Sequence, residues 1–343
     1  MTKSVGIIGL GPMGLRHARA VVRSEQLTLL GGCDLREETG RLLQDLQSNA
    51  AFFTDAYQLL TKQPDILVIA TNAPSHKEIF MQAAEMGIRR FVIEKPLCTS
   101  IEDAHAIKRV SEELGCRVVV NISRRYSELY QSLKKRLSNV EEGPGELRSF
   151  FTAFGAGGLG NNGTHFLDLA LYLLDKKPKM IIGALDRQGV PNPRGEQFDD
   201  PGAYGLILLE DGKRIFLEMG EDFGVAGKMQ LLGRYGRVII DELQRKLTIE
   251  ARNVEDRSAA MTRTGTPIHK LPGDFDPPLD IIRLAQSAIE EAAGDGEITC
   301  GLEEALTVLR LVIGLHLSGE SGCSPILYTD VDELASGRTF SFT

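Results

Sequence analysis

The chain has 343 residues, more than one ordinary hydrophobic core holds, so two domains are expected. Hydrophobic residues make up 42% of it and charged residues 25%, which is typical of a globular protein. The formal charge of −8, without clustered runs of Lys and Arg, argues against nucleic-acid binding. No apolar stretch approaches the roughly 20 residues that span a bilayer, so no membrane segment is expected either.

The cysteines and the N-terminal sequence indicate the compartment. Five cysteines are scattered without a CxxC pair, at Cys33, Cys98, Cys116, Cys300 and Cys323. This pattern favours reduced thiols in a cytoplasmic protein over a disulfide framework, and it offers no metal site. The apolar run Val5–Leu10 is too short for a secretory signal and leads into a glycine motif without a cleavage site. We interpret this run as a strand.

Residues 1–120 alternate short β-rich runs with amphipathic stretches, which predicts strand–helix–strand units and a parallel sheet. The expected strands are Ser4–Ile8, Thr28–Cys33, Ile66–Ala70, Arg90–Ile93 and Arg117–Asn121. The expected helices are Met13–Arg23, Glu37–Leu46, His76–Met86 and Ile101–Leu114. The strands are rich in Val, Ile and Leu, as strands buried on both faces are. This segment is predicted to be a doubly wound α/β domain.

The pattern changes after residue 120, and residues 121–343 are predicted to form a second, α+β domain. The first expected elements are a helix over Ser127–Leu137, a strand over Glu146–Phe154 and a helix over Gly163–Leu174. The strands that follow are Tyr204–Leu209, Arg214–Met219, Lys228–Leu232 and Arg237–Asp241. Short Asp-Gly and Tyr-Gly turns join them, which predicts an antiparallel sheet.

The last third of the chain is predicted to contain loops and two helices. Asp186–Gly202 and Asn253–Phe275 are polar and are expected as long surface loops. A helix is expected over Pro278–Ala293, with Asp276 as its N-cap and Pro277 at its first position. Another is expected over Leu302–Leu317.

The most specific motif is Gly9-Leu10-Gly11-Pro12-Met13-Gly14, which follows a strand and opens a helix. Its glycines suit a tight turn, a close approach of backbone to a pyrophosphate, and close packing of helix on strand. Asp34 ends the second strand, where a carboxylate can accept hydrogen bonds from the ribose 2′-hydroxyl of NAD. Arg36 could instead hold a 2′-phosphate. The motif predicts a dinucleotide site that prefers NAD over NADP.

Glu94-Lys95-Pro96 follows the strand Arg90–Ile93, so it lies at the carboxyl edge of the parallel sheet, where ligands bind. A lysine there can steady a developing alkoxide or donate to a carbonyl oxygen. The alternative is a solvated turn at a strand end. Whether the Lys95–Pro96 bond is cis cannot be read from sequence.

At this point the chain resembles the Gfo/Idh/MocA family of oxidoreductases (glucose-fructose oxidoreductase, inositol dehydrogenase, rhizopine catabolism). The matching segments are Gly9–Gly14, Ile69–Thr71 leading to His76, Glu94–Pro96, Arg124–Tyr126, Gly163–Asp168 and Leu232–Gly236. The resemblance implies a Rossmann domain followed by a large open, mostly antiparallel sheet that commonly forms subunit interfaces. It therefore implies a homodimer or homotetramer. It also places Lys95 between nicotinamide and substrate, and implies that Thr71, Asn72, His76 and Glu94 belong to the cofactor site.

The second catalytic candidate is His165, where family members that oxidise sugars and inositols usually carry Asp-x-x-x-His. Here the aspartate position is Asn161. If the helix already runs from Asn161, the two side chains share one face of it. His165 could then take the substrate hydroxyl proton, but Asn161 offers only amide hydrogen bonds and no charge for an imidazolium. Asp168 either orients His165 or has a structural role. His17, His105, His269 and His316 are interpreted as surface or packing residues.

The functional hypothesis is an NAD-dependent dehydrogenase or reductase acting on a polyhydroxylated ring. The segment Asn161–His165 is similar to family members of surface-sugar biosynthesis, which favours a nucleotide sugar. One alternative is a non-catalytic NAD(P)-sensing regulator on the same scaffold, which the presence of both Lys95 and His165 disfavours. Another is an enzyme that oxidises one carbon transiently to allow elimination at the next.

Overall fold

The computed structural model divides into two compact units, which are described separately. The first comprises residues 1–126, 280–309 and 335–343, and the second comprises 127–279 and 310–334. The structure describes residues 2–140, 143–155, 158–187, 192, 194–220, 224, 227–258, 268–271, 273, 275 and 278–343. The first unit contains the whole predicted N-terminal domain. Two C-terminal segments also join it, which the order of elements along the chain did not indicate.

The first unit is built on a parallel sheet with the strand order β3-β2-β1-β4-β5-β6. Its strands are β1 (Lys3–Ile8), β2 (Leu27–Cys33), β3 (Ala51–Phe53), β4 (Ile66–Ile69), β5 (Arg90–Ile93) and β6 (Arg117–Val120). This order is that of a Rossmann fold, and it reverses between β1 and β4, where such sheets bind their ligands. The four residues of β4 are fully buried, as expected for a strand with helices on both faces. The predicted doubly wound sheet is confirmed.

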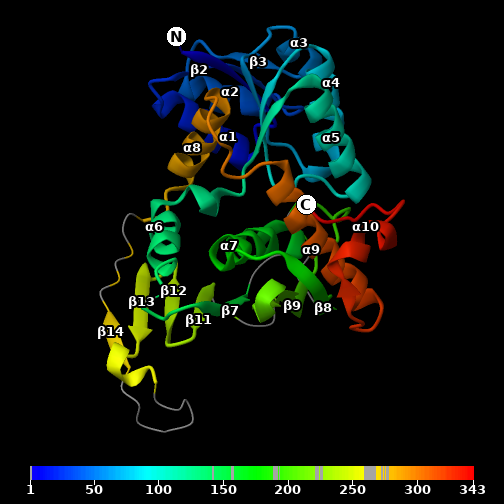
Figure 1. Ribbon diagram of the computed structural model, residues 1–343. Coiled ribbons are helices and arrows are strands. Elements are labelled where there is room, and N and C mark those ends of the chain that lie inside the picture. Colours follow the sequence, from blue (N-terminus) through cyan, green and yellow to red (C-terminus); the bar gives the residue numbers. More distant parts are fainter. Residues whose placement is uncertain are drawn as a thin grey trace. The chain divides into compact units, whose positions relative to one another are not determined.

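Helices cover both faces of this sheet. They are α1 (Pro12–Arg23), α2 (Glu38–Leu46), α3 (Ala56–Leu60), α4 (His76–Glu85), α5 (Ile101–Leu114) and α8 (Ile281–Ala293). The helix α8 packs against α1, and α4 and α5 pack together on the other side of the sheet (Figure 1). The short elements β3 and α3 were not predicted, because neither is long enough to show a hydrophobic period.

The start of α8 differs from the prediction. The helix begins at Ile281, and Asp280 is its N-cap, since its carboxylate accepts hydrogen bonds from the backbone N–H groups of Ile282 and Arg283. Pro278 precedes the helix, and the predicted cap Asp276 with Pro277 lies outside the described residues. An aspartate before an apolar run can mark the start of a helix, and this sequence has two such aspartates, Asp276 and Asp280.

The second unit is built on a sheet with the order β14-β13-β12-β11-β7-β10-β9-β8-β15. Its strands are β7 (Leu147–Phe154), β8 (Pro178–Asp186), β9 (Gly202–Leu209), β10 (Arg214–Met219), β11 (Lys228–Gly233), β12 (Gly236–Asp241), β13 (Lys246–Ala251), β14 (His269–Leu271) and β15 (Ile326–Leu327). All the pairings are antiparallel except β7 with β10, which is parallel. The large, mostly antiparallel sheet is confirmed. The strand β14 lies within the predicted loop Asn253–Phe275, where three residues were too few to detect.

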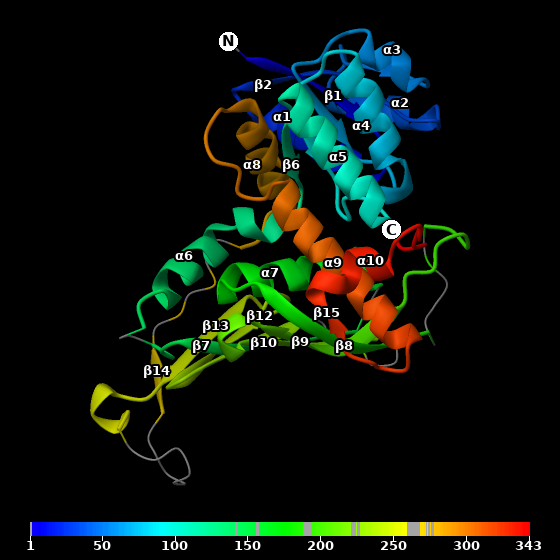
Figure 2. The ribbon, with the colours of Figure 1, turned by 45° about the vertical axis from the view of Figure 1, so that its right-hand side comes forward.

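One face of this sheet is covered and the other is open. The helices α6 (Glu128–Leu137) and α7 (Thr164–Leu174) lie on the covered face (Figure 2). Along β10 the side chains of Ile215, Leu217 and Met219 are buried, whereas Phe216 is half-buried and Glu218 is exposed. The sheet therefore alternates in the manner of a one-sided layer. The remaining helices are α9 (Leu302–Glu320), divided between the units, and α10 (Val331–Leu334). Among the described residues, no helix combines the length and the apolar character needed to cross a membrane.

Candidate functional site

The glycine turn between β1 and α1 has the steric features of a phosphate-binding loop. Gly9 has a φ of 91°, and a Cβ there would lie 2.6 Å from the backbone of Ala70. A Cβ on Gly14 would lie 1.8 Å from the Gly9 carbonyl oxygen, so glycine is required at both positions. Among the described residues, the one atom within 4 Å of a Cβ on Gly11 would be Arg36 Nη2, at 3.9 Å. The loop thus packs tightly against neighbouring backbone at Gly9 and Gly14 and leaves space beside Gly11.

The helix that follows this turn presents its N-terminus at the open side. Pro12 is its first residue, where a missing N–H costs nothing, and Gly11 is the N-cap. Gly11 has no side chain with which to cap the helix, so the N-cap leaves its first N–H groups uncapped. Met13 is the second helical residue, and its sulfur accepts a hydrogen bond from Arg16 Nη1 at 3.1 Å. Free N–H groups and the helix dipole make this end suited to an anion.

Asp34 lies directly after β2 and beside the glycine turn. Its Oδ2 accepts a hydrogen bond from the Leu10 backbone N–H at 2.7 Å. Arg36 binds the same carboxylate with two nitrogens, Nε to Oδ1 at 3.0 Å and Nη2 to Oδ2 at 3.1 Å. Burial acts to raise the pKa of Asp34, but the bonds from Arg36 and Leu10 lower it below the ordinary value. A charged acceptor is therefore fixed beside the turn.

The segment after β4 holds three residues predicted for the cofactor site. Asn72 is exposed and precedes the 3₁₀ turn Ala73–Ser75, and the hydroxyl of Ser75 donates to Thr71 Oγ1 at 2.8 Å. His76 begins α4 and is completely buried. Its ring nitrogens lie 3.0 Å from the carbonyl oxygen of Thr71 and 3.1 Å from that of Leu97. Its ring thus joins two loops, and burial lowers the pKa of His76.

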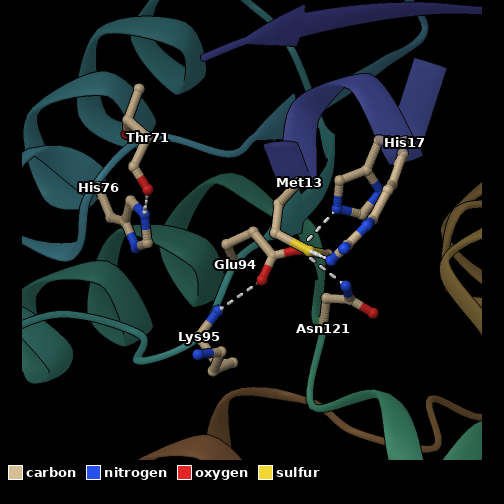
Figure 3. A network of polar contacts seen from close by, with 8 residues as sticks. Met13, His17, Thr71, His76, Glu94, Lys95 and Asn121 are labelled. Atoms are coloured by element: carbon tan, nitrogen blue, oxygen red, sulfur yellow. Dashed lines mark hydrogen bonds and ion pairs between the residues drawn. The ribbon is translucent and has the colours of Figure 1, made fainter. Parts of the chain in front are cut away.

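Glu94-Lys95-Pro96 follows β5 at the carboxyl edge of the sheet, and the Lys95–Pro96 bond is cis. Glu94 is 5% exposed and turned inward, whereas Lys95 is half-buried. Glu94 Oε1 lies 2.7 Å from His17 Nε2 and accepts from Asn121 Nδ2 at 2.8 Å (Figure 3). Its Oε2 accepts from the Lys95 backbone N–H at 3.3 Å. The strand end thus carries a buried carboxylate next to a lysine that reaches the surface.

In the second unit, Asn161 and His165 lie on a modified helical turn. Residues Leu159–Gly163 form a π-helical turn, and the α-helix α7 begins only at Thr164. The predicted helix over Gly163–Leu174 is found, but the condition that a regular helix already runs from Asn161 to His165 is not met. In a π-turn the backbone hydrogen bonds span five residues instead of four, so the two side chains are not placed by the ordinary four-residue spacing. His165 is half-buried, near the N-terminus of α7, and Asp168 is completely buried.

The carboxylate of Asp200, which lies outside this π-turn in the sequence, accepts two hydrogen bonds from the backbone of the turn. Its Oδ1 accepts from the backbone N–H of Gly160 at 2.7 Å, and its Oδ2 accepts from that of Asn161 at 2.9 Å. The side chain of Asn161 accepts a hydrogen bond from Arg194 Nη2 at 3.2 Å. A carboxylate is therefore present beside Asn161, bound to its main chain, and a guanidinium contacts its side chain.

Sequence reasoning missed three of these residues, which are His17, Asn121 and Asp200. His17 was interpreted as a packing or surface residue, and it is indeed buried, but in contact with Glu94. Its spacing of three residues from Gly14 places it one turn inside α1, which could have indicated that it faces the sheet. No local signal connects Asp200 to Gly160, since about forty residues separate them.

The residues of the first unit fit a dinucleotide. The space above Gly11 can admit a diphosphate, the end of α1 supplies N–H donors, and Asp34 supplies an acceptor for a ribose hydroxyl. Thr71, Asn72 and Lys95 follow neighbouring strands of the same sheet at the same edge. The direct contacts of each residue with a cofactor remain predictions.

Comparisons with known proteins agree with this geometry. Residues 3–122 match the family GFO_IDH_MocA, described as an oxidoreductase family with an NAD-binding Rossmann fold. The scyllo-inositol 2-dehydrogenase (NAD(+)) of Bacillus subtilis (strain 168) is 27% identical over 256 residues, which are 69% of this chain and 73% of that protein. The glucose-6-phosphate 3-dehydrogenase of the same strain is 26% identical over 193 residues, 50% of this chain and 54% of the relative.

The fold of the whole chain is also found in solved structures. An oxidoreductase from Agrobacterium radiobacter, solved with NAD+, L-tartaric acid and magnesium, superimposes with a TM-score of 0.79. The alignment covers 96% of this chain and 99% of that one, at 17% sequence identity. Both units thus belong to one known architecture.

Proposed function

Because the chain belongs to the Gfo/Idh/MocA family of NAD-binding oxidoreductases, we propose that it transfers hydride between NAD and a CH–OH carbon of a cyclitol or sugar. The observation that carries the proposal is the common placement of the glycine turn, Asp34 and Lys95 at the carboxyl edge of one parallel sheet. An anion site, a ribose acceptor and an amine at one sheet edge are what a nicotinamide dinucleotide enzyme needs.

The cofactor is held by the first unit. The N–H groups at the start of α1 bind the diphosphate, and Asp34 accepts hydrogen bonds from the ribose hydroxyls. Bound NAD supplies the site that accepts or returns hydride. Since Arg36 is engaged with Asp34 through two hydrogen bonds, its guanidinium is neutralised and a 2′-phosphate gains little from it. This is the physical reason for a preference for NAD over NADP.

We assign Lys95 to the oxygen of the reacting carbon. As the alcohol is oxidised, negative charge develops on this oxygen, and an ammonium that donates a hydrogen bond there stabilises it. Glu94, which precedes Lys95, is buried, and its Oε2 accepts a hydrogen bond from the Lys95 backbone N–H at 3.3 Å. This contact holds the backbone of Lys95 at the strand end.

We assign His165 to the proton of the substrate hydroxyl. The imidazole accepts this proton while hydride leaves the same carbon, so an alcohol becomes a ketone, and the reverse steps reduce the ketone. Only the uncharged imidazole can accept this proton. Asn161 keeps the turn in place through its main chain, and it lies beside the carboxylate of Asp200.

The substrate class rests on the relatives. Those named above are a cyclitol dehydrogenase and a sugar-phosphate dehydrogenase, both acting on rings with several hydroxyl groups. A cyclitol or a free or phosphorylated sugar is therefore our proposal for this chain. The preference for a nucleotide sugar, drawn from the segment Asn161–His165, stays a prediction, as does the cytoplasmic location.

The open face of the second sheet is proposed to form the contact between subunits of a homodimer or homotetramer. Its centre is a shallow depression of about 530 Å³ with Phe151, Tyr204 and Phe216 in its lining. Phe151 and Phe216 stack with ring centroids 4.3 Å apart, and Tyr204 is 54% exposed. Aromatic side chains on a sheet face are suited to a second copy of the same face. Light scattering of the Phe216→Glu variant tests this, because a dimer interface predicts a shift to monomer.

The enzymatic proposal is tested with purified protein. Nucleotide released on denaturation is identified by mass spectrometry, and inositols, glucose 6-phosphate and nucleotide sugars are then screened for NADH formation at 340 nm. We expect NAD and turnover of a ring alcohol. The Gly11→Val variant is the control, because its side chain fills the diphosphate space and should remove both results. Protein that binds no dinucleotide and turns over no ring alcohol would refute the proposal.

A further inference from the structure

The chain segment that carries Lys95 is buried at every other position. From Phe91 to Ser100, each residue is buried except Lys95, which is half-buried. Backbone N–H and C=O groups that are withdrawn from water have to find their hydrogen-bond partners within the protein. The groups that bind the backbone on either side of Lys95 therefore set the point from which its side chain leaves the protein interior.

One such group lies on each side of the lysine. On the strand side, Glu94 Oε2 accepts a hydrogen bond from the Lys95 backbone N–H at 3.3 Å. On the other side, the carbonyl oxygen of Leu97 lies 3.1 Å from His76 Nδ1. His76 begins α4, which connects β4 to β5, and it is 0% exposed. Its ring thus reaches the end of β5 from the connection that leads into that strand.

The ring of His76 lies between two carbonyl oxygens but can donate to only one of them. Its Nε2 is 3.0 Å from the carbonyl oxygen of Thr71 (Figure 3). Because burial lowers the pKa of His76, the ring is neutral at neutral pH and carries a single N–H. Leu97 is 2% exposed whereas Thr71 is half-buried, so an oxygen left without a donor costs more at Leu97. The N–H therefore belongs on Nδ1, facing Leu97.

We propose that His76 is a positioning residue for Lys95: its Nδ1–H donates to the carbonyl oxygen of Leu97 and holds the buried segment from which the lysine emerges. This role rests on the proposed function, in which Lys95 binds the oxygen of the reacting carbon. It places His76 behind the cofactor site, in contrast to the membership of that site that the family resemblance implied. A completely buried ring offers no surface to a ligand.

Two amide substitutions separate the two ring nitrogens. The Nδ2 atom of asparagine lies as many bonds from Cβ as the imidazole Nδ1, so His76→Asn keeps a donor at Leu97. The Nε2 atom of glutamine corresponds to the imidazole Nε2, so His76→Gln keeps a donor at Thr71 only. We expect His76→Gln to lower kcat by about 10- to 100-fold, because a displaced lysine stabilises the reacting oxygen less well. The KM for NAD should change little, and His76→Asn should retain most of the wild-type kcat.

Ser111→Ala is the matched control for lost stability. The hydroxyl of Ser111 donates to the carbonyl oxygen of Cys116 at 3.0 Å, and Ser111 is 5% exposed. The change therefore also removes a buried bond from a side chain to a backbone oxygen. Cys116 directly precedes β6, at the amino edge of the same sheet and thus far from the end that carries Lys95. We expect Ser111→Ala to lower the thermal unfolding temperature and to leave kcat unchanged.

A measurement on the wild-type protein needs neither a substrate nor a variant that folds well. Nuclear magnetic resonance of protein labelled with ¹⁵N-histidine shows which ring nitrogen carries hydrogen, and the signal lost in His76→Asn or His76→Gln identifies the residue. We expect the Nδ1–H form. Hydrogen exchange of residues 95–100 should become faster in His76→Gln than in His76→Asn, because only the former lacks a donor at Leu97.

The outcomes separate this role of His76 from the proposed function. An Nε2–H or doubly protonated ring overturns the inference, and so does wild-type kcat in a folded His76→Gln variant. Equal losses of kcat in both amide variants would show that the donor at Leu97 is not what positions the lysine. Absence of turnover in wild type, together with the Nδ1–H form and the difference in hydrogen exchange, overturns the proposed function instead. The hold of His76 on the Lys95 segment would then stand.

Discussion

The two units position their candidate catalytic residues in different ways. In the first, the glycine turn, Asp34 and Lys95 each follow a strand directly, so the sheet brings them to one edge. In the second, His165 follows a π-turn whose Gly160 backbone N–H donates a hydrogen bond to Asp200, a residue 40 positions further along the chain. The first arrangement is fixed by local chain order, and the second depends on long-range hydrogen bonds between the π-turn and Arg194, Asp200 and Pro201. We therefore expect the first to tolerate changes around it better than the second.

The largest effect is expected for His165→Asn. This change removes the group that accepts the proton and should lower kcat by about 10²- to 10⁴-fold, with binding of NAD changed little. Stopped-flow or steady-state NADH formation measures it, with His105→Asn on the exposed face of α5 as the control. The double variant with Lys95→Met should lose far less than the product of the single losses, because the two residues serve one step. Wild-type kcat in His165→Asn would remove it from the mechanism.

The contact that holds the π-turn gives the sharpest test of the comparison. Asp200→Asn keeps the shape but weakens the hydrogen bonds to Gly160 and Asn161, and kcat should fall by about 10- to 100-fold. Its neighbour provides the control, because Asp199 is exposed and pairs only with Arg187 in the described residues. Equal activity of Asp200→Asn and Asp199→Asn would show that the turn does not depend on this carboxylate.

In the first unit, Asp34→Ala tests the ribose acceptor. It should weaken NAD binding by about tenfold and NADP binding by much less, because Arg36 is then released to meet a 2′-phosphate. Calorimetric titration with both nucleotides measures the ratio, and Asp45→Ala on the exposed side of α2 is the control. Equal losses for NAD and NADP would contradict the role of Asp34.

The smallest effect is expected for Asn161→Asp, which restores the aspartate usual in the family. The new carboxylate would lie next to Arg194 and be partly neutralised by it, so the acid limb of the kcat profile should move by less than about one unit. Adding Arg194→Gln should release the charge, favour protonated His165 and move this limb to higher pH. An identical profile in the single and double variants would show that Arg194 does not screen this position.

These differences also explain what the sequence predicts. The strand β1, the glycine motif and Asp34 are adjacent in the chain, and each has a local signature, so their arrangement was predicted and the fold confirmed. The network around Glu94 was not, because Asn121 and His17 meet it only when β5, β6 and α1 have packed. The cap of α8 at Asp280 and the π-turn before α7 were missed for a related reason, since local patterns allow several starts and tertiary contacts select one.

The most direct test of the proposed activity is the fate of a single hydrogen. The protein is incubated with NAD and a ring alcohol carrying deuterium at the carbon to be oxidised, and the nucleotide is analysed by mass spectrometry. Direct transfer predicts NADH that is heavier by one deuterium, and it predicts none in Lys95→Met that still binds NAD. Unlabelled nucleotide with a dehydrated product, or no reaction with any cyclitol or sugar, would contradict it.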